Sequence, residues 1–160
     1  MTDFEGLLKS LHNGRVDFII VGGAAAVVHG SARLTEDLDL VYSRKPENIE
    51  RLTAALLPLT PYLRGAPPGL PFQWDARTVQ HGLNFTLVTS MGSLDLFGEI
   101  TGGGTYEELL SNCIEITLFG IPCRCLNLEQ LIKVKRAAGR PKDLEAIAEL
   151  EALQEERDRR

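Results

Sequence analysis

The sequence predicts an α/β (α+β) domain in which helices flank a mixed β-sheet. Strand-like apolar runs occur early and in the middle of the chain, helical patterns surround them, and the C-terminal part reads as helical. A chain of 160 residues with 44% hydrophobic residues suits one hydrophobic core. We therefore expect one domain over residues 1–160, with a core of about residues 15–126 and a helical part of about residues 127–157.

Helical and strand patterns alternate in the first part of the chain. Phe4, Leu7, Leu8 and Leu11 have helical spacing and precede the stop signal Asn13-Gly14. An unbroken apolar run over residues 18–21 indicates the first strand. Polar and apolar residues alternate over residues 37–40, which indicates the second strand. Pro46 suits the first turn of a later helix. The expected elements are a helix over residues 3–13, strands over 17–21 and 37–42, and helices over 24–29 and 46–57.

The second part of the chain begins with a proline-rich loop over residues 58–71, and such long loops are often functional. Asn127 is a plausible helix cap and Gly139 a helix stop. The glycine run over residues 102–104 lacks the ending of a phosphate loop and is expected to be a hinge or lid. The remaining expected elements are hairpins of strands 83–89 with 93–97 and 114–119 with 121–126, and helices over 128–138 and 141–156.

The composition narrows the compartment and the class of partner. Cys113, Cys123 and Cys125 are an odd number without CxxC spacing, so we expect buried thiols in a reducing cytoplasm. The N-terminal residues are acidic and polar, and no apolar run matches a bilayer, so we expect no membrane association. A net charge of −5 argues against a non-specific nucleic-acid binder.

Three aspartates form the candidate catalytic and metal site. Asp37 and Asp39 alternate with Leu38 and Leu40, so both carboxylates lie on one face of a strand, with Cβ atoms about 6.5–7 Å apart. Asp95 lies in a second apolar strand. If the two strands are neighbours, the three carboxylates converge into a ligand set for two Mg²⁺ ions about 3.5–4 Å apart. The alternative is an acidic face in contact with solvent.

Glycines and basic residues provide the candidate nucleotide site. Gly22 and Gly23 follow a strand and precede a helix, where backbone amides can approach a triphosphate. A basic cluster over residues 133–142 could offset its charge, with Lys135, Arg140 and Lys142 the best candidates. Arg33, between Gly30 and Asp37, could contact phosphate or pair with an acid, and the cluster could equally be a solvated helix face.

This pattern resembles the nucleotidyltransferase superfamily. The residues that match the superfamily pattern are an apolar residue followed by Gly22-Gly23 and, after thirteen intervening residues, Asp37-Leu38-Asp39-Leu40. A third acidic residue, Asp95, follows in a later strand. The segments 22–39 and 133–143 look especially like the AbiEii-type toxins and their minimal relatives. The resemblance covers most of residues 15–150, although its specific motifs are confined to three short stretches.

The resemblance implies a nucleotidyltransferase fold and a metal-dependent transferase of the ATP-binding or other NTP-binding kind. Gly22 and Gly23 would contact phosphate, Asp37 and Asp39 would bind metal, and Asp95 would be the third carboxylate and general base. A Lys-Asp pair of the family maps to Lys142 and the residue after it. The acceptor would be tRNA, a protein or a small molecule, and a toxin–antitoxin role would add a cognate antitoxin as partner.

Another interpretation of the chain remains open, namely a catalytically silent module that keeps the fold and binds an NTP or a protein. Some single residues also have structural interpretations. His29 is expected to be a helix-end or core histidine rather than a catalytic one. Tyr62 and Trp74 border the proline-rich loop, where ordinary packing is favoured over stacking on a base.

Overall fold

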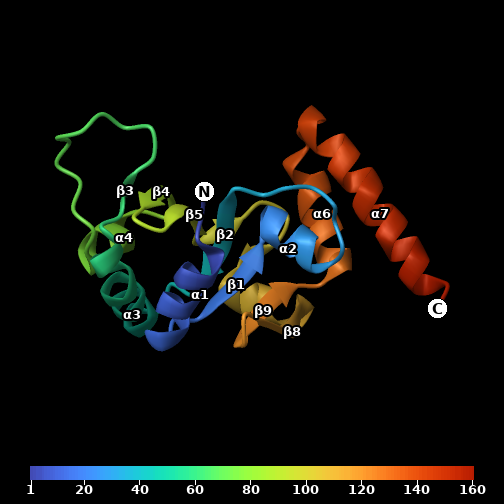
Figure 1. The fold of residues 1–160 in the computed structure, drawn as a ribbon, viewed down its shortest axis with the longest axis horizontal. Helices are drawn as coiled ribbons and strands as arrows, with labels where there is room; N and C mark the ends of the chain where they lie inside the picture. Colours follow the sequence, from blue (N-terminus) through green and yellow to red (C-terminus); the bar gives the residue numbers. More distant parts are fainter.

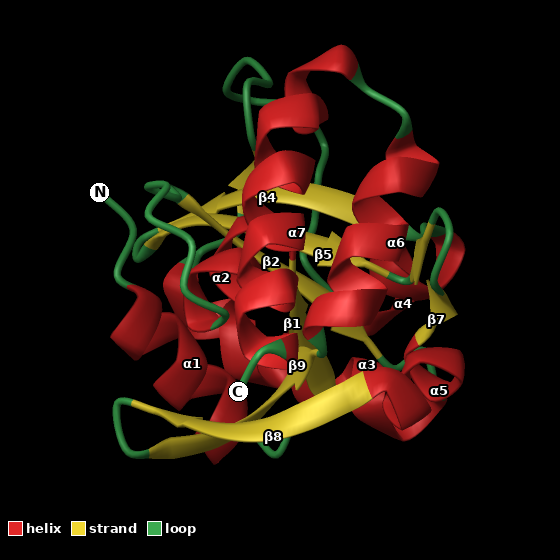
Figure 2. Ribbon diagram, turned by 90° about the vertical axis from the view of Figure 1, so that its right-hand side faces the viewer, coloured by secondary structure: helices red, strands yellow, loops and turns green.

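The computed structural model describes all 160 residues and contains a seven-stranded mixed sheet of order β3-β4-β5-β2-β1-β9-β8 (Figure 2). A separate two-stranded sheet pairs β6 with β7. The strands are β1 (Phe18–Val21), β2 (Asp37–Tyr42), β3 (Tyr62–Leu63), β4 (Asn84–Thr89), β5 (Gly92–Phe97), β6 (Glu99–Ile100), β7 (Gly104–Thr105), β8 (Cys113–Leu118) and β9 (Ile121–Leu126).

Seven α-helices surround the sheet, and α6 and α7 pack together at the C-terminal end of the chain (Figure 1). Single 3-10 turns cover Leu57–Leu59, Leu110–Asn112 and Pro141–Asp143. The helices are α1 (Phe4–Asn13), α2 (Gly22–Val28), α3 (Pro46–Leu56), α4 (Ala76–His81), α5 (Tyr106–Leu109), α6 (Leu128–Ala138) and α7 (Leu144–Asp158). The mixed α/β class expected from the sequence is confirmed.

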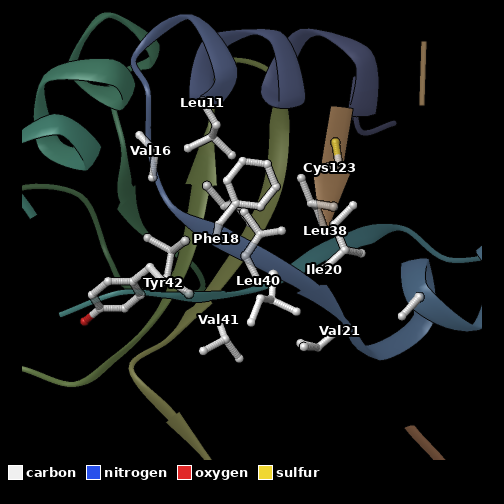
Figure 3. Packing of buried hydrophobic residues seen from close by; sticks show 14 of the residues in the cluster. Leu11, Val16, Phe18, Ile20, Val21, Leu38, Leu40, Val41, Tyr42 and Cys123 are labelled. Carbon is white, nitrogen blue, oxygen red and sulfur yellow. The ribbon is translucent and has the colours of Figure 1, made fainter. Parts of the chain in front are cut away.

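The central strand β2 decides where the polar residues lie. It pairs antiparallel with β1 and parallel with β5, and the second register places Asp39 opposite Asp95. Because strand side chains alternate, Leu38 and Leu40 point away from the aspartates and are almost completely buried. Figure 3 shows both leucines packed with Phe18 and Ile20 of β1.

Helices α1 and α3 supply much of the cover for this core. Their apolar faces bury Leu7, Leu11 and Leu52 completely, as the helical spacing requires. Trp74 is also buried, and its indole donates a hydrogen bond of 3.1 Å to the carbonyl of Thr53 in α3. One face of the sheet is thus fixed by apolar packing, which leaves the aspartates on the other face.

Most elements match the expected ranges, with differences at short segments. The helix expected from residue 24 begins at Gly22, and the last helix is preceded by a 3-10 turn and extends to Asp158. The loop over residues 58–71 contains a 3-10 turn and β3. Helices α4 and α5 and the β6–β7 pair were not expected, because each is too short to produce a periodic pattern.

Every helix of the structure falls short of the length and apolar character that a bilayer crossing requires.

Candidate active site

The three aspartates lie on the same face of two neighbouring strands. Asp37 and Asp39 come from β2 and Asp95 from β5, and the parallel register pairs Asp39 with Asp95. The two strands are therefore neighbours, which was the condition for the three carboxylates to converge. All three side chains are partly exposed to solvent, while the leucines between them are buried.

A cation that sequence reasoning missed lies among these carboxylates. The Arg64 guanidinium donates from Nη2 to Asp95 Oδ1 at 2.5 Å, and its Nη1 is 3.7 Å from Asp37 Oδ2. Nη2 also donates to the carbonyl of Leu87 in β4 at 2.8 Å. Arg64 follows the two-residue strand β3, and no motif in the sequence distinguishes it from other arginines.

Asp39 receives no such partner. Its Oδ1 is buried without a hydrogen bond. Burial is the largest cause of a rise in its pKa to about 7, and the negative charges of Asp95 and Asp37 act in the same direction. Lys135 of α6 opposes the rise, which places its ammonium group within electrostatic range of the carboxylate.

Gly22 brings the start of α2 against Asp39. Its φ is +63°, and a Cβ there would lie 2.1 Å from Asp39 Oδ2, so both the backbone conformation and the space require glycine. A Cβ on Gly23 would lie 2.8 Å from Thr35 Oγ1. The glycine pair thus lies beside the carboxylates, and its expected contact with phosphate remains a prediction.

Three of the four basic residues expected at the nucleotide line one pocket. Arg33, Lys135 and Lys142 surround a cavity of about 210 Å³ together with Gly23, and helices α6 and α7 contribute its walls. Arg140 is not among the lining residues. The structure therefore joins the glycine turn and three of the expected cations in one place.

Acidic side chains hold several of these cations. Asp143 accepts from Arg140 at 2.7 Å and from Lys135 at 3.3 Å. Burial opposes the ionisation of Asp143, but these bonds outweigh it and lower its pKa. Arg33 lies 3.6 Å from Glu149 in α7. Arg33 therefore pairs with an acid, and its expected contact with phosphate stays a prediction.

The remaining candidate residues have structural roles. His29 is buried at the end of α2, and its Nε2 lies 2.7 Å from the carbonyl of Leu126. Trp74 packs edge-to-face on Phe85, which confirms packing over base stacking. Tyr62 packs on Phe72 in the same way.

The cysteines fit the expectation of free thiols. Cys123 and Cys125 are buried, and Cys113 is partly buried. Burial raises the pKa of Cys113 and Cys123 to about 11 and that of Cys125, the deepest, to about 12. Thiols with such pKa values are poor nucleophiles at neutral pH.

The residues fit a hard divalent cation in their chemistry. Carboxylate oxygens are the preferred ligands of Mg²⁺, and the buried Asp39 Oδ1 lacks any other partner. In the present arrangement no three His, Cys, Asp or Glu side chains are grouped to hold a metal ion, and Arg64 contacts Asp37 and Asp95 instead.

Comparisons with known proteins rest on structure, because the chain matches no protein-family model and no curated protein. A crystal structure of ANT(2'')-Ia in complex with adenylyl-2''-tobramycin superposes with a TM-score of 0.58 at 18% identity, covering 97% of this chain and 95% of that one. The solution structure of the antibiotic-resistance factor ANT(2'')-Ia gives 0.51 at 19% identity, covering 80% of this chain but only 65% of that chain.

A third solved structure is an antigenic nucleotidyltransferase-like protein from Paracoccidioides brasiliensis. It superposes with a TM-score of 0.57 at 19% identity and covers 95% of this chain and 77% of that one. At these identities the likeness concerns the fold. This chain therefore has the mixed-sheet fold of the nucleotidyltransferases.

Proposed function

We propose that the protein is a nucleotidyltransferase, which moves a nucleoside monophosphate from a magnesium-bound NTP to an acceptor hydroxyl and releases pyrophosphate. The observation that carries the proposal is the pairing of Asp39 with Asp95 across β2 and β5, beside a pocket lined by Lys135 and Lys142. A nucleotidyltransferase fold supports it.

The carboxylates of Asp37, Asp39 and Asp95 would hold the metal, with two Mg²⁺ ions as the expected complement. Bound Mg²⁺ supplies charge neutralisation for the triphosphate and lowers the pKa of a coordinated hydroxyl. Without a cation, Asp39 has an uncompensated carboxylate and a raised pKa. A bound divalent cation would thus supply the positive charge that the Asp39 carboxylate lacks.

The pocket residues would bind the triphosphate. Lys135 and Lys142 approach from α6 and the 3-10 turn that follows it, and Arg33 from the loop after α2. Lys135 pairs with Asp143 and lies within electrostatic range of Asp39, so it connects the pocket to the carboxylates. Charge-assisted hydrogen bonds from such side chains hold phosphate oxygens well.

Asp95 would take the proton of the acceptor hydroxyl as that oxygen attacks the α-phosphorus. The bond to the bridging oxygen of pyrophosphate then breaks, and the positive charges of the pocket stabilise the leaving group. For Asp95 to accept a proton, its oxygen has to be released from Arg64, to which it is now hydrogen bonded.

Two different likenesses suggest two different acceptors. The AbiEii-type pattern in residues 22–39 and 133–143 favours tRNA or a partner protein as acceptor, in a toxin–antitoxin pair. The ANT(2'')-Ia complex contains adenylyl-2''-tobramycin, which makes a small hydroxylated molecule the other candidate. We favour the macromolecule, because the sequence motifs of this chain support it.

A labelling assay tests the function. The protein is incubated with each α-labelled NTP, Mg²⁺ and a cell extract, and label on a macromolecule is expected with at least one NTP. D39N should abolish transfer while leaving the fold intact. D17N is the matched control, because Asp17 is a half-exposed aspartate paired with Arg51 outside the site.

Two outcomes would contradict the proposal. Undiminished labelling by D39N would show that the carboxylate of Asp39 is not needed for catalysis. Metal-dependent NTP binding in calorimetry without transfer to any acceptor would favour a catalytically silent module instead.

A further inference from the structure

We infer that Arg64 takes the place of a divalent cation among the three aspartates and has to leave it before the cation binds. The inference rests on the proposed metal site. Its basis is the position of the guanidinium, which contacts Asp95 through Nη2 and Asp37 through Nη1. One cation of this chain therefore bridges the two strands that would share the metal.

The guanidinium neutralises this site only in part. It carries one positive charge against three carboxylates, and it leaves Asp39 Oδ1 without a partner. Its own Nε is also buried without an acceptor. Buried polar groups without partners are costly, so the present arrangement is less favourable than its two ion pairs suggest. A divalent cation that contacts all three carboxylates would correct the Asp39 deficit.

The attachment of Arg64 allows its side chain to move while its backbone stays. The backbone N–H donates to the carbonyl of Thr86 at 3.0 Å, which fixes the end of β3 to β4. Beyond it, Gly65 and Gly69 have positive φ, and a Cβ atom at either position would have no other atom within 4 Å. Figure 1 shows the segment after β3 extending away from the sheet. The Arg64 side chain is 29% exposed, so rotation about its side-chain bonds can carry the guanidinium toward solvent.

This competition lowers the apparent affinity for the metal. A ligand that binds only the open state has its affinity reduced by the fraction of molecules in that state. Removing the guanidinium should therefore tighten cation binding, although it removes two ion pairs. A residue that merely stabilised the site would give the opposite result, because its loss would disorder the ligands.

Mn²⁺ binding without nucleotide provides the test. Wild type, R64K, R64Q and D39N are titrated with Mn²⁺ by calorimetry and electron paramagnetic resonance, after their folding is checked by circular dichroism. D39N should lose Mn²⁺ binding, because it removes one of the proposed ligands. R64Q should bind about tenfold more tightly than wild type. R64K should lie between, because a lysine keeps the charge but lacks the planar fork that reaches two carboxylates.

R51Q is the matched control and should bind Mn²⁺ as wild type does, since Arg51 pairs with Asp17 away from the site. Equal affinity of R64Q and wild type, with binding still lost in D39N, would overturn the role of Arg64 and leave the metal site intact. Absence of Mn²⁺ binding in both proteins would overturn the metal site itself and this inference with it.

A measurement on the wild-type protein covers the case in which R64Q fails to fold. The side-chain NMR signals of Arg64 are followed during a Mg²⁺ titration. Release should speed the exchange of its guanidinium protons with water. Unchanged Arg64 signals, at Mg²⁺ concentrations that shift the Asp39 signals, would overturn the inference.

Discussion

Asp39 combines a central position in the sheet with an unsatisfied carboxylate. The strand pattern of the sequence predicted its face, and its pairing partner Asp95 was predicted only on condition that β5 lay next to β2. The raised pKa of Asp39 could not be predicted, because it depends on burial that the sequence does not specify. The same holds for Arg64, which reaches the site through β3, a strand of two residues.

Asp39→Asn is expected to stabilise the metal-free protein at pH 8. The folded pKa of about 7 lies above the unfolded value, so the penalty of ionising Asp39 grows as pH rises from about 4 through 7. Each unit of pKa corresponds to about 1.4 kcal/mol, and we expect a gain of at least about 1 kcal/mol at pH 8. Urea denaturation at pH 8 and pH 5 checks this.

At pH 5 only about one of the three pKa units separating the folded and unfolded carboxyl has been titrated, so the gain from the substitution should be about a third of that at pH 8. An equal gain at both pH values would mean that the charge of Asp39 is not the cause.

Gly22→Ala should destabilise the protein through contact with Asp39. The built Cβ would lie 2.1 Å from Asp39 Oδ2, in addition to the strain of a positive φ. Gly120→Ala is the matched control, because Gly120 has φ +77° and no other atoms within 4 Å of a built Cβ. Backbone strain alone costs about 1 kcal/mol or more, and Gly22→Ala should cost at least about 1 kcal/mol beyond its control. Equal losses in thermal or urea unfolding would show that the contact is relieved at no cost.

At the scale of elements, long periodic segments were predicted well and short ones were not. Helix α6 has an asparagine cap, an apolar face and a terminal glycine, and its predicted range 128–138 is the observed one. Helix α5 has four residues and depends on a capping box of Thr105 and Glu108, a signal too local to stand out. Hydrophobic periodicity needs more residues than such a helix has.

The turn between α6 and α7 depends on one carboxylate. Asp143 is nearly buried and pairs with both Lys135 and Arg140. Asp143→Asn should cost about 1–3 kcal/mol in urea denaturation at neutral pH, because Lys135 and Arg140 lose their anionic partner and one of its two acceptor oxygens. The lowered pKa gives the pH dependence: the contribution is present above about pH 4 and is lost as pH falls through the folded pKa.

Asp158→Asn, near the exposed end of α7, is the control for this substitution and should change the stability little. A similar stability of both variants would show that the turn is held by its apolar contacts alone.

At the scale of the whole molecule, the candidate site gathers residues that are far apart in the sequence. Its parts come from β2 and the loop before it, from β5, from the residue after β3 and from the junction of α6 and α7. The sequence identified most of these residues by their chemical type and spacing. It could not indicate that Arg140 lies outside the pocket lining or that Arg64 lies among the carboxylates, since both depend on long-range packing.

The strand order also separates the stiff and the yielding parts of the site. β2 has a partner on each side and carries two aspartates, whereas β3 forms an edge and precedes Arg64. Amide hydrogen exchange should therefore be slowest over residues 38–41 and faster over residues 62–64, where β3 has a partner strand on one side only. Protection of β3 equal to that of β2 would contradict this gradient. Because the aspartates lie on rigid strands while the neighbouring edge is mobile, small cations can enter and leave without displacing their ligands.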